Sequence, residues 1–179
     1  MKILMLIAHP DDEAIFGAND LLSKDNNVTV VCFTNLNNKI RSAEFFKCMK
    51  LAGSAGYMLD LNDAIDDGWP YMTTGELGDL VTSKLTGVYD MIVSHDKNGE
   101  YGHPQHKRVH VVANALAKRM AIPFSGFKAR YNLASLDMAR RAFILSKIYK
   151  SQKHSMKWGT DYVDKYYGKK RMTRKKKYN

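Results

Sequence analysis

Two short clusters of histidine and carboxylate side chains could carry out chemistry together. The first, His9-Pro10-Asp11-Asp12-Glu13, holds one imidazole and three carboxylates within five residues. The second, His103-Pro104-Gln105-His106, repeats the His-Pro pair and offers two imidazoles three positions apart. Two histidines, one carboxylate and a water make up the ligand set of a hydrolytic zinc site. Such a metal polarises an amide or ester carbonyl and lowers the pKa of its water to about 7. The pattern therefore predicts a metal-dependent hydrolase.

Helical geometry suggests different roles for the two aspartates. Pro10 has its backbone angle preset for the first helical position, so we expect Asp11, Asp12 and Glu13 in the first turn of a helix. Asp12 is three residues after His9 and shares its face, which makes Asp12 the better metal ligand. Asp11 is turned away by about 100° and is better placed as the general base that takes the proton of the water. Glu13 either contacts the metal-binding residues without binding the metal itself, or is simply a carboxylate favoured by the helix dipole.

The second cluster has the same layout as the first. Pro104 again suits the first helical position, and His103 stands at the entry of the helix. His103 and His106 are three apart and share a face, so spacing alone leaves His103 open as a further metal ligand. His110 extends the same stripe, and there we expect a packed or hydrogen-bonded histidine.

Strand and helix signals alternate along the chain and must position both clusters. A short apolar, β-rich run precedes each cluster, and ligands of open α/β sheets bind just past the carboxyl ends of strands. The alternation predicts an α/β fold with a mainly parallel sheet flanked by helices. Expected strands are 2–8, 28–33, 57–61 and 91–94, with a further one at 127–131. Expected helices are 11–24, 39–54 (stopped by Gly56), 76–85, 104–120 and 136–149, and 95–102 is expected as a polar loop.

Charge is distributed unevenly along the 179 residues, whose net charge is +10. Residues 1–100 hold 8 Lys/Arg against 15 Asp/Glu, whereas the remainder is strongly basic. We expect one domain over 1–150 and a basic, partly ordered extension over 151–179. The run from Lys169 to Lys177 is typical of a solvated tail, and the alternative is contact with a polyanion such as nucleic acid or an anionic membrane surface.

Compartment and membrane signals are weak. Cys32 and Cys48 provide no disulfide framework, and we expect buried free thiols in a reducing compartment, hence a cytoplasmic protein. No apolar run approaches the roughly 20 residues that a membrane span needs, so we expect no transmembrane segment. The N-terminal apolar run lacks a small-residue cleavage site and does not resemble a signal peptide.

Together the two clusters resemble those of the zinc-dependent de-N-acetylases of the PIG-L/LmbE type. The likeness rests on Ala8-His-Pro-Asp-Asp-Glu13 after a strand and on Gly102-His-Pro-Gln-His106, and it weakens through Tyr149-Lys-Ser-Gln152. It implies a Rossmann-like fold and removal of acetate from an N-acetylated amino sugar, in a conjugate or glycan resembling N-acetylglucosamine. The implied cofactor is Zn²⁺, with other divalent metals as alternatives.

The resemblance also implies roles for individual residues. His9, Asp12 and His106 correspond to the zinc ligands, and Asp11 corresponds to the general base. His103 corresponds to a histidine that stabilises the oxyanion or protonates the leaving amine rather than binding metal. Tyr101 corresponds to a tyrosine near the oxyanion. Arg41 and Asp63 correspond to residues that contact the substrate, with Asp66 and Asp67 as alternatives to Asp63.

Two departures from the family pattern leave the substrate open. Asn62-Asp63-Ala64 stands where a Pro-Asp-Gly is usual, and Gln105 stands where some members carry an aspartate. Besides a sugar deacetylase, the sequence is therefore compatible with a metal-dependent amidase acting on a non-sugar acyl amide. A protein that binds polyanions through its basic C-terminal half is the third alternative.

Overall fold

A five-stranded parallel sheet forms the centre of the protein. The computed structural model describes residues 1–64, 68–130, 144 and 147–153. The strand order is β3-β2-β1-β4-β5, and every described pair is parallel. The strands are β1 (Lys2–Ile7), β2 (Asn27–Thr34), β3 (Ala55–Leu61), β4 (Met91–Ser94) and β5 (Phe124–Gly126). The expected α/β architecture with a parallel sheet is confirmed.

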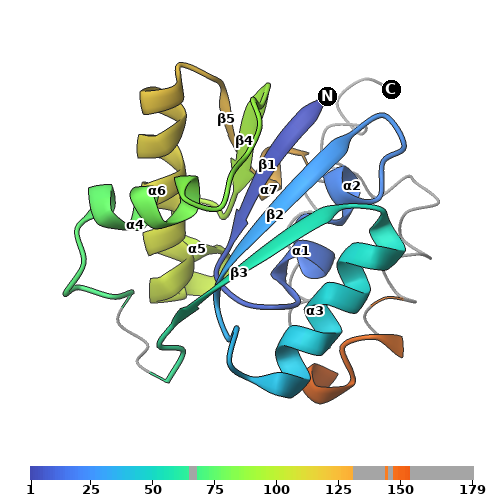
Figure 1. The fold of residues 1–179 in the computed structure, drawn as a ribbon. Helices are drawn as coiled ribbons and strands as arrows, with labels where there is room; N and C mark the ends of the chain where they lie inside the picture. The colour runs from blue at the N-terminus through green and yellow to red at the C-terminus, as the bar shows by residue number, and fades with distance from the viewer. Residues whose placement is uncertain (65–67, 131–143, 145–146, 154–179) are drawn as a thin grey trace, which may run out of the picture.

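Helices cover both faces of this sheet (Figure 1). On one side lie α1 (Asp12–Ile15), α2 (Ala18–Leu21) and α3 (Lys39–Ala52). On the other lie α4 (Thr74–Thr82) and α6 (Pro104–Met120), the latter with the bounds that the sequence predicts. Three short elements complete the described chain, namely α5 (Gly99–Gly102), α7 (Phe127–Arg130) and the 3₁₀ turn η1 (Lys150–Gln152).

The central strand β1 contributes to two separate cores. Successive side chains of a strand point to opposite faces, so Ile3, Met5 and Ile7 join the core under α3, whereas Leu4 and Leu6 join the core under α4 and α6. All five side chains are fully buried. Burial of each contributes about 1.5–3 kcal/mol to stability, which explains why this strand reads as an uninterrupted apolar run.

The segment after β1 differs from the single helix expected over 11–24. Two short helices, α1 and α2, replace it, with a break at Gly17. A Cβ at Gly17 would lie 2.8 Å from Sδ and Cε of Met5 and 3.0 Å from the carbonyl oxygen of Glu13, so a larger residue here would displace the end of the buried Met5 side chain. Asp11 is the residue before α1 rather than part of its first turn, and its φ of 119° is left-handed.

Helix α3 ends earlier than the sequence predicts. Gly53, with a left-handed φ of 67°, caps it and donates its N–H to the carbonyl of Lys50. Gly56 belongs to β3 instead, where a Cβ would lie 2.5 Å from Cγ of Met49. Helix α4 begins at Thr74 rather than at the expected Glu76. Thr73 and Glu76 form a reciprocal capping box that fixes this start.

The region after α6 contains the largest error of the sequence prediction. The strand expected at 127–131 is displaced: β5 comes earlier, and Phe127 begins α7. A side chain at Gly126 would collide with Asp96, and Phe127 is buried against Phe16 with the ring centroids 6.3 Å apart. The predicted loop at 95–102 contains the helical turn α5.

Parts of the C-terminal predictions lie outside the described residues. This holds for most of the helix expected over 136–149 and for the basic run near the C-terminus, so the polyanion contact stays a prediction. Within the described residues, no helix is long and apolar enough to cross a membrane. Cys32 and Cys48 are free and buried, as expected.

Candidate active site

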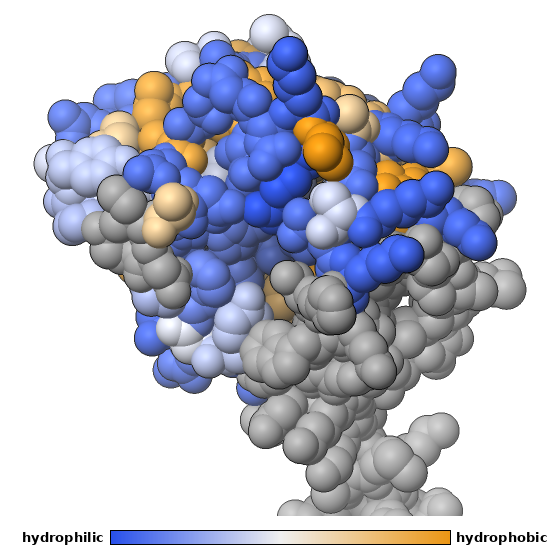
Figure 2. All heavy atoms as spheres, turned by 90° about the horizontal axis from the view of Figure 1, so that it is seen from below, coloured by the Kyte–Doolittle hydropathy of each residue, from blue (hydrophilic) through white to orange (hydrophobic). Residues whose placement is uncertain are grey.

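A cavity of about 190 Å³ lies where the strands end at their carboxyl side. Figure 2 looks onto this end of the molecule and shows a largely hydrophilic face around a hollow. β2 and β3 lie on one side of β1, and β4 and β5 lie on the other. The strand order therefore reverses between β1 and β4, and open α/β sheets bind ligands at such a point. The residues lining the cavity include His9, Asp11, Asp12, Arg41, Asp63, Tyr101, His103 and Gln152.

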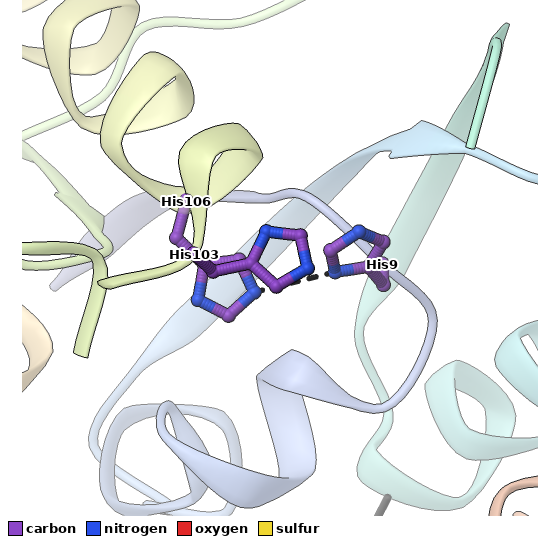
Figure 3. A group of neighbouring side chains, drawn as sticks. All are labelled: His9, His103 and His106. Carbon is purple, nitrogen blue, oxygen red and sulfur yellow. Dashed lines mark hydrogen bonds between the residues drawn. The ribbon is translucent and has the colours of Figure 1, made fainter. Parts of the chain in front are cut away.

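Three histidines from the two motifs meet beside this cavity (Figure 3). His9 follows β1, whereas His103 and His106 come from the start of α6. Nδ1 of His9 is 3.3 Å from Nε2 of His106, and one nitrogen of each of the three rings lies within 4.8 Å of the others. Residues 97 positions apart in the chain thus present nitrogen atoms to one point.

Asp12 completes this group with a carboxylate. Its Oδ2 is 3.3 Å from Nδ1 of His9, and its Oδ1 is 3.5 Å from Nε2 of His106. The carboxylate also accepts the backbone N–H of His9 at 2.8 Å, which closes the turn into α1. Asp12 faces His9 and His106 with different oxygens, and two imidazole nitrogens with a carboxylate, nearly excluded from solvent, are donor types that suit a zinc ion.

A second set of potential ligands, Asp12, His95 and His106, lies deeper. His95 is fully buried and stacks on His106 with centroids 3.9 Å apart. Its Nε2 lies 3.1 Å from the backbone nitrogen of Ala8 and 3.3 Å from Oδ2 of Asp12, and the charges of Glu100 and Asp12 outweigh burial and raise the pKa of His95 to about 9, so this nitrogen is already engaged with its neighbours. The group that includes His9 is therefore the better candidate for a metal.

The far nitrogens of His9 and His106 both contact carboxylates. Nε2 of His9 lies 3.2 Å from Oδ1 of Asp63 and 2.5 Å from Oε1 of Gln105. Nδ1 of His106 lies 2.7 Å from Oε2 of Glu100. Metal-binding histidines usually hold such a partner, which orients the ring and fixes its tautomer.

The charges around the two rings shift their pKa values in opposite directions. Burial lowers the pKa of His9, but hydrogen bonds and charges of Asp12 and Asp63 outweigh it and raise the pKa to about 10. Burial and the neighbouring His95 lower the pKa of His106 to about 4. At neutral pH a proton on His9 therefore joins it to the surrounding carboxylates.

Asp11 lies at the cavity in a strained backbone conformation. Its φ of 119° and ψ of −26° are left-handed, so the 100° rotation per residue of a helix does not apply between Asp11 and Asp12. Burial and the charge of Asp12 raise the pKa of Asp11 well above its usual range. Such a carboxylate is a stronger base than an exposed one.

A buried hydrogen-bond network of Glu13 and Tyr149 contacts the backbone of Asp11. Oε2 of Glu13 accepts the N–H of Asp11 at 3.1 Å, and Oε1 of Glu13 accepts the hydroxyl of Tyr149. Burial raises the pKa of Glu13 to about 7, although the Tyr149 hydroxyl opposes this shift. The C-terminal segment continues to the cavity, because Ser151 binds Glu44 of α3 and Gln152 lines the cavity.

The residues predicted to bind substrate also line the cavity. Arg41 Nη1 is 2.7 Å from Oδ2 of Asp63, and Arg41 Nη2 donates to the carbonyl of Pro10 at 3.3 Å. Asn35 donates to the same carboxylate of Asp63 at 2.9 Å. The Asp63 carboxylate thus contacts Arg41, Asn35 and His9. The alternatives Asp66 and Asp67 lie outside the described residues.

Tyr101 and His103 stand together at the opening of the cavity. Their ring centroids are 5.7 Å apart, and Tyr101 is 42% exposed while it lines the cavity. His103 is the residue before α6, and Pro104 takes the first helical position as expected. His110, predicted to be packed or hydrogen-bonded, lies 2.8 Å from the carbonyl of His95 through its Nδ1.

Sequence reasoning missed the contacts that Glu100 and Tyr149 make in the site. Glu100 stands three residues before His103, in a stretch predicted as loop, and no periodic signal marks it. Tyr149 is 136 positions away from Glu13, and only the fold brings them together. The family's late Ser-Gln segment was the one available signal for the latter.

Comparisons with known proteins agree with this geometry. The family model described as "PIG-L: GlcNAc-PI de-N-acetylase" matches residues 4–117. An uncharacterized protein of Acanthamoeba polyphaga mimivirus is 34% identical over 124 residues, which cover 59% of this chain and 53% of that protein. A 1D-myo-inositol 2-acetamido-2-deoxy-alpha-D-glucopyranoside deacetylase of Corynebacterium diphtheriae is 27% identical over 160 residues, covering 68% of this chain and 54% of that enzyme.

The chain spans about half the length of these two relatives. Among solved structures, the A40926 pseudoaglycone deacetylase Dbv21 superimposes with a TM-score of 0.66 at 14% identity, covering 91% of this chain and 88% of that one. This likeness shows a shared fold. Because the family model matches well over half of the chain and includes both histidine motifs, the chain belongs to the PIG-L family.

Proposed function

We propose that this protein is a metal-dependent hydrolase that removes acetate from an N-acetylated amino sugar resembling N-acetylglucosamine. The observation that carries the proposal is the convergence of Nδ1 of His9, Nε2 of His106 and the Asp12 carboxylate beside Asp11 at one cavity. The family, and the deacetylase named among the relatives, support this choice of reaction.

His9, Asp12 and His106 would hold the metal, Zn²⁺ or another divalent ion. When bound, the ion supplies a positive charge that polarises the acetamide carbonyl and makes a water more acidic. Asp63 and Glu100 orient the two histidines from their far nitrogens. The Asp12 carboxylate is kept ionised, because the nearby histidines hold its pKa well below its usual range despite the burial.

Asp11 acts as the general base in this mechanism. It removes the proton of the water as the oxygen attacks the acetamide carbon, and the Glu13–Tyr149 network keeps its backbone turn in place. His103 and Tyr101 line the cavity and stabilise the oxyanion that forms. The C–N bond then breaks, acetate is formed, and His103 or the protonated Asp11 delivers a proton to the leaving amine.

The polar cavity favours a sugar as the substrate. Arg41 and Asp63 line one wall, and the surrounding face is largely hydrophilic (Figure 2). Hydroxyl-rich rings are recognised by charged and amide side chains of this kind. Arg41 is held by Asp63 and by the carbonyl of Pro10, so its guanidinium is oriented before substrate arrives.

The test compares acetate release by the zinc-loaded native chain, Asp11→Asn and the control Asp79→Asn. Asp79 forms an exposed ion pair with Arg119, and neither residue lines the cavity. Loss of the Asp79 charge should therefore leave the site intact. Substrates are N-acetylglucosamine linked to inositol, malate, lipid or oligosaccharide, together with acyl amino acids.

We expect Asp11→Asn to bind zinc but to lose roughly 10²–10⁴-fold in turnover of a sugar conjugate, the usual contribution of a general base. Native turnover by zinc-loaded Asp11→Asn would refute the mechanism. Cleavage of acyl amino acids without cleavage of any sugar conjugate would instead identify a non-sugar amidase.

A further inference from the structure

We propose that Glu100 is a positioning residue, whose buried carboxylate holds the proton of His106 on Nδ1 and thereby directs the lone pair on Nε2 of His106 toward His9 and Asp12. The meaning of this arrangement for metal binding rests on the proposed function. The tautomers themselves are a property of the metal-free protein and can be measured in it.

The contacts of Glu100 account for both of its oxygens. Oε2 is 2.7 Å from Nδ1 of His106 and 3.0 Å from Nδ1 of His95. Oε1 accepts the backbone N–H of Asp96 at 2.9 Å. The carboxylate is completely enclosed, so these neighbours replace the water that an ionised carboxylate would otherwise require.

Hydrogen-bond chemistry then determines where the protons lie. An ionised carboxylate only accepts, so each imidazole must place its proton on Nδ1 to bond with Glu100. On the far side of His95, Nε2 lies 3.1 Å from the backbone nitrogen of Ala8 and 3.3 Å from Oδ2 of Asp12. Burial lowers the pKa of His95, but the charges of Glu100 and Asp12 outweigh it and raise the pKa to about 9, so the proton arrangement of this ring depends on Asp12 as well as on Glu100. On the far side of His106, Nε2 points at Nδ1 of His9 and Oδ1 of Asp12, where a lone pair can bind a metal.

His95 and His106 stack on one another beside Glu100. His95 and His106 lie nearly parallel, with an interplanar angle of 19°, and both present Nδ1 to the same oxygen. His95 is fixed in turn by the backbone of Ala8, the residue before His9. The second motif is therefore held in register with the first through Glu100 and His95.

The backbone at Glu100 provides an independent observation. Its φ of 54° and ψ of −79° are rarely adopted by residues other than glycine, and they interrupt the short helix α5. Gly99 and Gly102, which flank this turn, also have positive φ values. Strained backbone at a functional site persists only where the surroundings impose it, and the three bonds to the carboxylate are such surroundings.

The first measurement is the tautomer of each histidine in the metal-free full chain, by long-range ¹H–¹⁵N NMR. His106 should carry its proton on Nδ1 and none on Nε2. A proton on Nε2 of His106 in the native protein would overturn the proposal. This result does not depend on finding a substrate or on loading a metal.

The second measurement is zinc affinity, by competition with a chromophoric chelator, for the native chain and Glu100→Gln. Loss of a carboxylate partner of a metal-binding histidine typically weakens metal binding 10–100-fold, and we expect that range, together with a changed His106 tautomer. The matched control is Glu76→Gln, which removes an exposed carboxylate from the cap of α4 and should leave zinc affinity within twofold.

A third variant separates positioning from charge. Glu100→Asp keeps the negative charge but shortens the side chain by one methylene, so it cannot reach both rings and the Asp96 N–H; zinc affinity should still fall at least fivefold. Native affinity and native tautomers in folded Glu100→Gln or Glu100→Asp would overturn the proposal. If either variant does not fold, the tautomers of the native chain still decide.

Failure of the proposed function gives a different result. A native chain that binds zinc weakly, or releases no acetate, contradicts the proposed function whatever the tautomers are. Nδ1–H tautomers that depend on Glu100 in such a protein would still support its positioning role.

Discussion

Zinc binding should be coupled to the loss of a proton from His9. Its pKa is about 10 in the metal-free protein, because contacts with Asp12 and Asp63 outweigh the effect of burial. A histidine must be neutral to bind a metal, so zinc has to displace this proton. Affinity should therefore rise as pH rises and level off only above about pH 10.

The size of the effect follows from this pKa. At pH 7 only about one His9 ring in a thousand is neutral, which costs zinc binding about 4 kcal/mol. Between pH 6 and 8 the affinity should increase about tenfold per pH unit. His106, with its pKa lowered to about 4, is already neutral over this range, and Asp12 is already ionised, so neither adds to the slope.

Two neighbours add to the count. Burial and the charge of Asp12 raise the pKa of Asp11, and the charges of Glu100 and Asp12 outweigh burial and raise the pKa of His95 to about 9, so a bound cation can release protons from both. Asp11→Asn removes only the contribution of Asp11. The variant should show a slope of at least one proton, and the native chain a steeper one.

Two assays measure the coupling. Competition with a chelator of known pH dependence gives the affinity at pH 6, 7 and 8. Titration calorimetry in two buffers with different ionisation enthalpies counts the protons released. An affinity of Asp11→Asn for zinc that stays constant from pH 6 to 8 would refute the reasoning, because His9 would then be neutral in the metal-free protein.

Three further changes test the scaffold around the site. Leu6→Ala, at a fully buried position of β1, should lower the free energy of unfolding by about 2–5 kcal/mol in urea titrations; a loss below 1 kcal/mol would contradict the packing described. Tyr149→Phe removes the hydroxyl donor of Glu13 and should cost about 1–3 kcal/mol and reduce turnover, and native values for both would show that the network is dispensable. Thr73→Ala should cost about 1 kcal/mol in unfolding experiments by removing the cap of α4, whereas Thr82→Ala, in the last turn of the same helix, should cost less.

The parts of the fold that the sequence predicts are those that local signals determine. β1 is a continuous apolar run because it is buried on both faces, and β4 has the same character over four residues. Helix α6 begins at Pro104, whose backbone angle suits a first helical position, and its apolar residues recur at helical spacing. Such signals lie within the element itself.

The errors arise where a residue responds to something distant in sequence. Gly17, at the break in the predicted helix, packs against Met5 of β1. Gly126, at the end of β5, packs against Asp96, and Phe127, at the start of α7, packs against Phe16. The residues next to each of these positions in the sequence do not include its packing partner.

The same distinction applies to the site. The types and spacing of His9, Asp12, His103 and His106 indicate a metal centre, and the structure brings them together. Asp11 stands before α1 with a left-handed backbone, so helix pitch does not set its direction, and the division of roles between Asp11 and Asp12 stays a prediction. The partners of the histidines, Asp63 and Glu100, contact them in an arrangement that spacing does not predict, and their roles as metal ligands and supports stay predictions.

Strand order explains why two motifs about ninety residues apart can form one site. The chain lays β2 and β3 on one side of β1 and then returns to place β4 on the other. β1 and β4 therefore lie side by side, paired from Ile3 with Met91 to Leu6 with Ser94, and the residues after each strand emerge at adjacent positions. Had β4 joined the outer edge next to β3, two strands would separate it from β1. Since neighbouring strands are about 4.8 Å apart, His106 would lie more than 10 Å from His9. The metal centre thus depends on the return crossover as much as on the histidines themselves.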